Sequence, residues 1–323
     1  MHAIMVRQPG GPNELMWAET PTPEPGPGDV LVKVTAAGVN RADLLQRQGH
    51  YPPPPGASDI LGLEASGVVA RCGPGVTTWR PGDPVVALVP GGGYAEYVVV
   101  PEQTCVAPPA GVDLAAAGGL MEAAATVLSN LDTARLAPGE TVLVHGGAGG
   151  VGGFAIQYAH ALGCRVLATA GTADKLEHCR RLGADVAIDY HGDWWDDVAI
   201  ATDDRGADVV WDIIGAAYLE HNVSVLADDG RLVIIGMQKG ARGTLDIARL
   251  LNKRGAVIAT SLRGRPLAQK AAICAGVSAR VWPHYADGTI AALPTTFVPM
   301  AEAARAHELL ESGATLGKIV LTV

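Results

Sequence analysis

The sequence predicts an α/β protein in two parts, a small β-barrel domain followed by a doubly wound parallel sheet. Short apolar runs separated by Pro and Gly fill residues 1–117, and from about residue 118 strand and helix patterns alternate. A β-branched run at 141–145 also leads into five glycines within seven residues, which is typical of a strand, a tight turn and a helix start. With 323 residues, 48% of them hydrophobic, the chain can build two cores.

The charge balance and the cysteines indicate which partners and compartment to expect. The chain has 24 basic and 33 acidic residues and a net charge of −9, without a basic run, which argues against nucleic-acid or anionic-membrane partners. Its five cysteines, Cys72, Cys105, Cys164, Cys179 and Cys274, include no C-x-x-C pair, so we expect reduced thiols and no zinc knuckle. No signal-peptide-like region and no run of about eighteen apolar residues occurs. We therefore expect a soluble, cytoplasmic protein that acts on a small molecule.

The first part is predicted to be all-β with one short helix. Its β-branched runs lie at 30–35, 65–70, 84–88 and 95–100, and the turns between them favour a small, partly closed barrel over a parallel sheet. Residues 40–48 combine an N-cap-like Asn40 with good helix formers and end at Gly49. The prolines at 52–55 then predict a stiff, extended loop that can form the wall of a cleft.

The second part is predicted to contain a helix at 123–131 and then six parallel strands. The strands recur at 141–145, 165–169, 186–189, 208–213, 231–235 and 256–260, with helices between them. Nearly continuous apolar strands that alternate with helices belong to a sheet covered on both faces, and six of them match a two-halved dinucleotide-binding sheet. A helix at 300–313 and a strand at 318–323 are expected to pack on the first domain. The predicted domains are 1–119 and 120–260, with a returning segment at 261–323.

The glycine turn is the predicted phosphate-binding element. Gly147, Gly149 and Gly152 fit the G-x-G-x-x-G pattern, while Gly146, Gly149 and Gly152 fit a looser three-spaced version, so the sequence leaves the register open. A helix at 151–162 follows, and its unpaired N–H groups and positive dipole end favour a pyrophosphate. The predicted cofactor contacts in this turn are Gly147, Ala148, Gly149, Gly150, Val151 and Gly152.

The residues after the second strand favour NADPH over NADH. An NAD-binding sheet usually carries Asp or Glu there to bind the ribose hydroxyls, but this chain has ATAGT at 168–172. Lys175 follows near a helix N-terminus, where a cation opposes the dipole unless an anion such as a 2′-phosphate is its partner. The predicted contacts are Gly171, Thr172, Lys175 and Tyr190, which ends the third strand. A solvated lysine and an aromatic loop residue remain the alternatives for the last two.

Several segments of the sequence resemble one family. The segments GVNRADL at 38–44, YPPPPG at 51–56, GLEASG at 62–67 and GKIV at 317–320, together with the glycine turn, resemble the zinc-independent quinone oxidoreductases of the medium-chain dehydrogenase/reductase superfamily. The similarity runs nearly end to end, and the p53-inducible quinone reductase-like members look most similar. The resemblance implies a GroES-like N-terminal domain, a Rossmann domain, NADPH, a cleft between the domains and a homodimer formed through the Rossmann sheet.

The resemblance also implies site residues. It places Asn40 beside the nicotinamide and Tyr51 at the substrate mouth, where either could hydrogen-bond a carbonyl oxygen as negative charge develops on it. Thr126 matches a position near the nicotinamide. Further predicted cofactor contacts follow the fourth to sixth strands or lie near the C-terminus: Gly215, Gly236, Ser261, Leu262, Arg263 and Lys318. As alternatives, Asn40 is a helix N-cap, Tyr51 packs the loop, the glycines form turns, and the two cations lie on the surface.

No metal is expected. Zinc-dependent relatives carry Cys at the position of Asn40 and His at that of Leu63, and neither replacement is a good zinc ligand. Asp43 and Glu64 remain, but two isolated carboxylates do not form a zinc site. Relatives also often have Ser where this chain has Gly149, so a hydroxyl contact near the cofactor is expected to be missing.

Three functions follow as hypotheses. The leading one is NADPH-dependent reduction of quinones, because a quinone needs only a positioned hydride and a proton from solvent. The first alternative is reduction of an activated carbon–carbon double bond in an alkenal or enoyl thioester, for which Tyr51 is the candidate proton donor. The second alternative is an NADPH-binding regulatory or partner-binding protein with little turnover.

Overall fold

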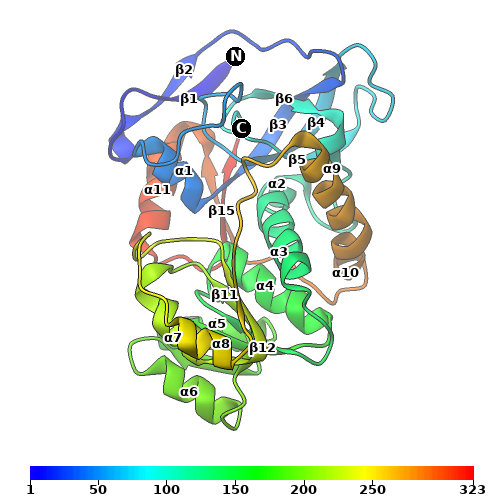
Figure 1. Ribbon diagram of the computed structural model, residues 1–323. Coiled ribbons are helices and arrows are strands. Elements are labelled where there is room, and N and C mark those ends of the chain that lie inside the picture. Colours follow the sequence, from blue (N-terminus) through cyan, green and yellow to red (C-terminus); the bar gives the residue numbers. More distant parts are fainter. The chain divides into compact units, whose positions relative to one another are not determined.

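The computed structural model describes residues 1–323 and divides them into two compact units. The first unit contains Met1–Ala125 and Leu262–Val323, and the second contains Thr126–Ser261. Figure 1 labels many of their helices and strands. The predicted α/β class is confirmed, since the first unit has a mainly antiparallel sheet and the second a parallel one. Every helix is too short or too polar to cross a lipid bilayer.

The first unit is built on a seven-stranded sheet in the order β14-β15-β3-β4-β5-β7, in which β6 also pairs with β3. Its strands are β3 (Asp29–Val39), β4 (Glu64–Cys72), β5 (Pro84–Leu88), β6 (Tyr97–Pro101), β7 (Cys105–Val106), β14 (Thr295–Pro299) and β15 (Lys318–Thr322). A separate two-stranded sheet contains β1 (His2–Val6) and β2 (Leu15–Glu19). The predicted strands correspond to β3, β4, β5, β6 and β15, whereas β1, β2, β7 and β14 were not predicted.

β3, with 11 residues, is the central strand of this sheet. β4 pairs along one edge of it, and the other edge is shared between β6, which pairs with residues 29–33, and β15, which pairs with residues 36–39. Val32 and Val34 of β3 and Ile319 and Leu321 of β15 lie in the same buried cluster. The C-terminal strand therefore completes the core of the first unit, and its register places Ile319 opposite Val39.

Two of the helices in the first unit were predicted from the sequence. The helices of this unit are α1 (Arg41–Arg47), α2 (Leu114–Ala117), α9 (Leu267–Gly276), α10 (Trp282–Ala286) and α11 (Ala303–Ser312), while α3 (Met121–Ala134) begins in this unit and continues into the second. α1 follows Asn40 at its N-cap, as predicted. The helix predicted at 300–313 is α11, which ends at Gly313 in the left-handed conformation, with φ +64°.

The second unit contains a six-stranded parallel sheet in the order β10-β9-β8-β11-β12-β13. Its strands are β8 (Thr141–Val144), β9 (Arg165–Ala170), β10 (Val186–Asp189), β11 (Ala207–Asp212), β12 (Leu226–Ile234) and β13 (Ala256–Ala259), and its helices are α4 (Gly150–Ala161), α5 (Ala173–Arg181), α6 (Trp194–Ala201), α7 (Leu219–Ser224) and α8 (Ile247–Asn252). The first strand lies inside the sheet and the chain winds outward from it in both directions. This confirms the predicted doubly wound sheet.

One strand of this sheet differs from its prediction. β12 begins at Leu226, although the sequence predicted a start at residue 231. Asp228, Asp229 and Gly230 are residues that favour turns, and Asp229 has φ +58°. The strand nevertheless continues past them, because its pairing with β11 shifts register between Ala207 and Val209 and so absorbs the extra residues.

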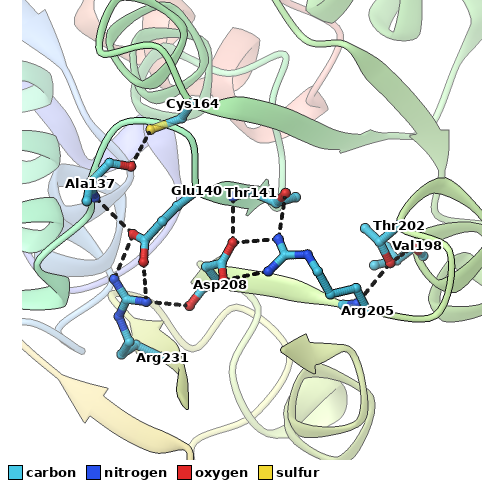
Figure 2. Close-up of polar contacts among 10 residues, drawn as sticks. Ala137, Glu140, Thr141, Cys164, Val198, Thr202, Arg205, Asp208 and Arg231 are labelled. Carbon is cyan, nitrogen blue, oxygen red and sulfur yellow. Dashed lines mark hydrogen bonds and ion pairs between the residues drawn. The ribbon is translucent and has the colours of Figure 1, made fainter. Parts of the chain in front are cut away.

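Two arginines connect the amino ends of β8, β11 and β12 (Figure 2). Arg231 donates to both carboxylate oxygens of Glu140, at 2.9 and 2.8 Å. Arg205 binds both carboxylate oxygens of Asp208, and Asp208 Oδ2 also accepts the main-chain N–H of Thr141 at 2.7 Å. Because the glycine turn follows the carboxyl end of β8, this cluster stabilises the sheet at the end away from the turn.

The two arginines are expected to differ in their contribution to stability. The Arg231 side chain is 13% exposed and also donates to two carbonyl oxygens at the end of α3. Arg231→Ala therefore removes the donor to these carbonyls and leaves the Glu140 carboxylate with only the main-chain N–H of Ala137. We expect this substitution to lower the free energy of unfolding by about 2–4 kcal/mol. The Arg205 side chain is 52% exposed, so Arg205→Ala is expected to cost less than about 1 kcal/mol. Urea unfolding of both variants checks this, and equal losses would contradict it.

Candidate functional site

The glycine turn between β8 and α4 has a defined register. Gly146 has φ +71°, which favours glycine. A Cβ on Gly152 would lie 2.2 Å from the carbonyl oxygen of Gly146, and a Cβ on Gly147 would lie 2.8 Å from Ile156 Cδ1 and 2.9 Å from Cys179 Sγ. Gly146 therefore makes the tight turn, and Gly152 allows the close packing of the helix against it. Gly146 was not among the predicted contacts, which began at Gly147.

The amino end of α4 is open to a ligand. Gly149 is its N-cap and has no side chain to bond the first N–H groups of the helix, which belong to Gly150, Val151 and Gly152. A Cβ on Gly149 would have only one neighbour within 4 Å, the carbonyl oxygen of Gly146 at 3.7 Å. The protein itself therefore does not require glycine at this position. A row of unpaired N–H groups beside open space is suited to a phosphate.

A buried histidine supports the turn, and the sequence did not indicate it. His145 Nε2 lies 2.8 Å from Asn222 Oδ1, so this nitrogen donates, and His145 Nδ1 then accepts from the Thr169 hydroxyl at 3.1 Å. The Thr169 oxygen in turn accepts the N–H of Gly146 at 3.3 Å. Burial lowers the pKa of His145 to about 4, which keeps the ring neutral and this hydrogen-bond chain intact. The chain connects the first glycine of the turn to α7.

The residues predicted to select NADPH lie at the carboxyl ends of β9 and β10. Thr172 caps α5 by accepting the main-chain N–H of Lys175 at 3.3 Å. A Cβ on Gly171 would lie 2.4 Å from the hydroxyl oxygen of Tyr190, so glycine makes room for the tyrosine. Lys239, in the loop after β12, lies with Nζ 5.9 Å from the centre of the Tyr190 ring. The structure thus brings the four predicted residues together and adds a second lysine that the sequence did not indicate.

The glycines after β11 and β12 bring two loops into contact. Gly215 has φ +83°, and a Cβ on it would lie 2.8 Å from the Cα of Met237. A Cβ on Gly236 would lie 2.7 Å from the carbonyl oxygen of Ile213. Both glycines therefore act as turn and packing residues, as the alternative interpretation of the sequence stated. Their contact with a cofactor stays a prediction. The same holds for Thr126 and Ser261, which lie at the two ends of the second unit.

Asn40, Glu64 and Lys318 form a buried polar cluster in the first unit. Asn40 is the N-cap of α1, and its main-chain N–H donates to Asp43 Oδ2 at 2.8 Å in a capping box. Asn40 Nδ2 donates to Glu64 Oε1 at 2.9 Å, and Lys318 Nζ donates to Asn40 Oδ1 at 2.9 Å and to Glu64 Oε1 at 2.8 Å. Lys318 and Glu64 are 5% and 0% exposed. The alternative of Lys318 as a surface charge is therefore wrong.

Asp43 connects this cluster to the C-terminal helix. Its carboxylate accepts the Tyr94 hydroxyl at 3.0 Å and the Gly62 N–H at 3.2 Å, while burial raises its pKa to about 6. The Tyr94 hydroxyl also lies 3.4 Å from Nε2 of His307 on α11, and His307 Nδ1 accepts from Arg47 at 3.1 Å. Helix α1, and with it Asn40, is held in place by contacts with the C-terminal tail.

Arg263 holds Tyr51 and the proline-rich loop. Its guanidinium donates to the carbonyl oxygens of Pro90 (2.7 Å) and Tyr51 (3.2 Å) and to Gln46 Oε1 (2.7 Å), and it lies 5.1 Å from the centre of the Tyr51 ring. Arg263 is 6% exposed and its neighbour Leu262 is 7% exposed, so the surface alternative is wrong here too. Burial, then the charge of Glu122, raises the pKa of Tyr51.

The side chains at the position where zinc-dependent relatives would carry their metal ligands do not fit zinc. Leu63 is buried and has no ligand atom, and the oxygens of Asn40 and Glu64 already bind the Lys318 ammonium. No group of three or more His, Cys, Asp or Glu side chains in the structure could hold a metal ion. The charge of Glu64 is balanced by a lysine, so these side chains do not provide the free ligand atoms that a metal ion needs.

The fold and the turn together define a class of protein. The sheet is six-stranded and parallel, winds outward from β8, and carries a glycine turn and an open helix N-terminus at the carboxyl end of that strand. This is the arrangement of a dinucleotide-binding α/β protein.

Comparisons with known proteins agree with this class. Residues 150–274 match the family model described as zinc-binding dehydrogenase, and residues 26–110 match the alcohol dehydrogenase GroES-like domain. The chain is 34% identical to a quinone oxidoreductase of Pseudomonas aeruginosa over 97% of this chain and 96% of that protein. It is 32% identical to a 2-haloacrylate reductase of Burkholderia over 99% of this chain and 98% of that protein. A solved structure of Escherichia coli quinone oxidoreductase complexed with NADPH matches all of both chains, with a TM-score of 0.89 and 30% identity.

The chain belongs to the medium-chain dehydrogenase/reductase superfamily, in its quinone oxidoreductase-like branch. It is an NAD(P)-dependent oxidoreductase with a GroES-like domain and a Rossmann-like domain, which confirms the predicted fold. The narrower likeness to the p53-inducible members stays a prediction.

Proposed function

We propose that the protein is an NADPH-dependent quinone reductase that works without a metal. The observation that carries this proposal is the Glu64–Lys318 pair, with Asn40 bonded to both, where zinc-dependent relatives would hold their metal. With no Lewis acid to polarise a carbonyl group, the acceptor must be electron-poor by itself. A quinone meets this condition, and the end-to-end likeness to a quinone oxidoreductase supports it.

The preference for NADPH is the second part of the proposal. The open amino end of α4 would hold the pyrophosphate, and Thr172, Lys175 and Tyr190 would hold the 2′-phosphate. Bound NADPH would supply the hydride. No Asp or Glu follows β9 in the segment 168–172, so no carboxylate there repels a 2′-phosphate.

Lys175→Ala is expected to weaken the binding of NADPH but not that of NADH. Loss of one charged hydrogen bond to a phosphate raises KM for NADPH by about 10- to 100-fold and leaves KM for NADH nearly unchanged. Lys33→Ala is the matched control, because Lys33 is an exposed lysine on β3 of the other unit. Steady-state kinetics with both cofactors measures the effect, and equal use of NADPH and NADH by the parent protein would contradict the proposal.

A panel of acceptors tests the reaction itself. Quinones, alkenals and enoyl thioesters are each offered with NADPH, and oxidation of the cofactor is followed by its absorbance. We expect turnover with quinones and no loss of activity after treatment with a metal chelator. If the parent protein reduces none of the quinones, the leading proposal is wrong.

One comparison favours a second candidate, reduction of an activated carbon–carbon double bond. A 2-haloacrylate is an unsaturated acid, and a reductase named for it is 32% identical over almost the whole chain. Turnover of alkenals or enoyl thioesters in the same panel, without quinone turnover, would favour this candidate. A protein that binds NADPH but reduces none of the acceptors would point to a regulatory or partner-binding role.

A further inference from the structure

A lysine side chain connects the two halves of the parallel sheet at its carboxyl edge. Lys239 follows β12, which belongs to the half β11-β12-β13, whereas Tyr190 follows β10 in the half β8-β9-β10. Lys239 Nζ lies 5.9 Å from the centre of the Tyr190 ring and 5.9 Å from the centre of the ring of Tyr218, which follows β11. The strand order reverses between β8 and β11, and a dinucleotide binds in the crevice at such a point. Lys239 therefore places a positive charge where the nucleotide is expected.

The main chain of Lys239 is held by the neighbouring loop. Its N–H donates to the carbonyl oxygen of Ile214 at 2.8 Å, and its carbonyl oxygen accepts the N–H of Ala217 at 3.3 Å. The next residue, Gly240, accepts the N–H of Ala216 at 2.9 Å. These partners all lie in the loop that follows β11. The lysine therefore projects from a fixed backbone, which reduces the loss of conformational entropy when it binds a ligand.

The rings below Lys239 Nζ are fixed as well. The Tyr218 ring contacts the rings of His145 and Trp194, with centroids 5.0 and 4.9 Å away. The Tyr190 hydroxyl lies against Gly171, where a Cβ would come within 2.4 Å of its oxygen. The face of a phenol ring attracts an ammonium group. The two rings thus hold the positive charge of Lys239 above the carboxyl edge of the sheet.

The carboxylates that end β10 and β11 do not neutralise Lys239. Asp189 Oδ1 bonds Nδ1 of His191 at 2.7 Å. The Asp212 carboxylate accepts main-chain N–H groups of the loop after β11, at 2.7, 3.2 and 3.1 Å. The side-chain contacts of Lys239 Nζ are the two ring faces, and an ammonium group carries three N–H donors. These donors are available to an anion that binds at the sheet edge.

We propose that Lys239 binds the 2′-phosphate of NADPH and is a second lysine, besides Lys175, that selects NADPH over NADH. The proposal rests on the proposed function, which assigns this phosphate to Thr172, Lys175 and Tyr190. Tyr190 belongs to both sets, because its hydroxyl lies next to Gly171 and its ring faces Lys239 Nζ. A phosphate monoester carries about −1.5 to −2 charges at pH 7 and three acceptor oxygens. It can therefore bind one lysine from each half of the sheet.

Binding of two small nucleotides tests the role of Lys239 without catalysis. Adenosine 2′,5′-bisphosphate carries the 2′-phosphate and 5′-AMP lacks it, and calorimetric titration gives the dissociation constant of each. Lys239→Met keeps the apolar stem and removes the charge. We expect this variant to raise the dissociation constant of the bisphosphate by about 5- to 50-fold and to leave that of 5′-AMP nearly unchanged. An unchanged affinity for the bisphosphate, or equal losses for the two nucleotides, would overturn the proposal.

Lys239→Arg and Arg165→Met are the matched variants. Lys239→Arg keeps a cation that binds phosphate and is expected to retain the preference for the bisphosphate. Arg165→Met removes the same charge from an exposed residue at the amino end of β9, and it is expected to bind both nucleotides as the parent protein does. A Lys239→Arg protein that binds the bisphosphate as weakly as Lys239→Met, or an equal loss in Arg165→Met, would contradict the proposal. Thermal unfolding confirms that all three variants fold.

The role of Lys239 and the proposed function fail in different ways. If the parent protein prefers the bisphosphate and Lys239→Met keeps the full preference, the role of Lys239 is wrong and the proposed function stands. If the parent protein binds 5′-AMP as tightly as the bisphosphate, the preference for NADPH is wrong and the role of Lys239 is wrong with it. If the binding results are as expected but no acceptor is reduced, the proposed reaction is wrong and the role of Lys239 stands.

Discussion

Gly152→Ala is expected to abolish tight NADPH binding and to destabilise the second unit. The added Cβ would lie 2.2 Å from the carbonyl oxygen of Gly146 and 3.0 Å from the Cα of Gly147. Both are backbone atoms, so the turn itself must move. A misplacement of about 1 Å in groups that position a ligand has effects on the order of 10²-fold, and we expect the affinity for NADPH to fall by at least that factor. Overpacking lowers the free energy of unfolding by about 1–3 kcal/mol.

Gly149→Ala is the matched control in the same turn. Gly149 has φ −83°, which suits alanine, and its Cβ would have a single neighbour at 3.7 Å. Its free energy of unfolding is expected to stay within about 0.5 kcal/mol of the parent value. Fluorescence titration with NADPH and thermal unfolding compare the two variants. Parent-like NADPH affinity in Gly152→Ala would contradict the phosphate-binding role of the turn.

Lys318→Met is expected to be the most destabilising substitution in the first unit. Lys318 and Glu64 are 5% and 0% exposed and their charged atoms are 2.8 Å apart. Removing the lysine leaves the charge of Glu64 buried with only the neutral Asn40 amide and the N–H of Glu122 as partners. Breaking a buried ion pair in this way costs about 3–5 kcal/mol. Chemical unfolding measures this loss without depending on catalytic activity.

The double variant Lys318→Met with Glu64→Gln separates the ion pair from the packing of the lysine. Glutamine carries no charge, and its single oxygen can accept from Asn40 or from the N–H of Glu122 but not from both, because these donors bond different oxygens of Glu64. We therefore expect the double variant to be more stable than Lys318→Met alone by at least about 1 kcal/mol. If the losses of the two single variants simply add, the pair does not contribute as a unit.

The architecture of the second unit was predictable because its signals are local. A buried parallel strand is a short apolar run, a helix stop is often a glycine, and the turn after β8 is visible as glycines in a row. The strands of the sheet were accordingly found within one residue of their predicted ends, except β12. The turn at Asp229 misled the prediction there, because a register shift that allows a strand to continue depends on the neighbouring strand.

The candidate site was predictable only in part. Asn40, Tyr51 and Lys318 were named from a family likeness, but their partners were not. Lys318 is 278 positions away from Asn40 in sequence. Only the pairing of β15 with β3 brings Lys318 Nζ to 2.9 Å from Asn40 Oδ1. The surface alternatives for Lys318 and Arg263 were wrong because a charged side chain can be buried when its partners come from distant segments.

The sequence by itself determined the parallel sheet, the glycine turn and the loss of the metal ligands, since each depends on residue type and spacing along the chain. Only the tertiary structure decided which glycines the turn requires, which histidine supports it and which lysine is buried beside Glu64. The physical reason is that close approach, burial and the balance of buried charge depend on distances between segments far apart in sequence, such as Glu64 and Glu122.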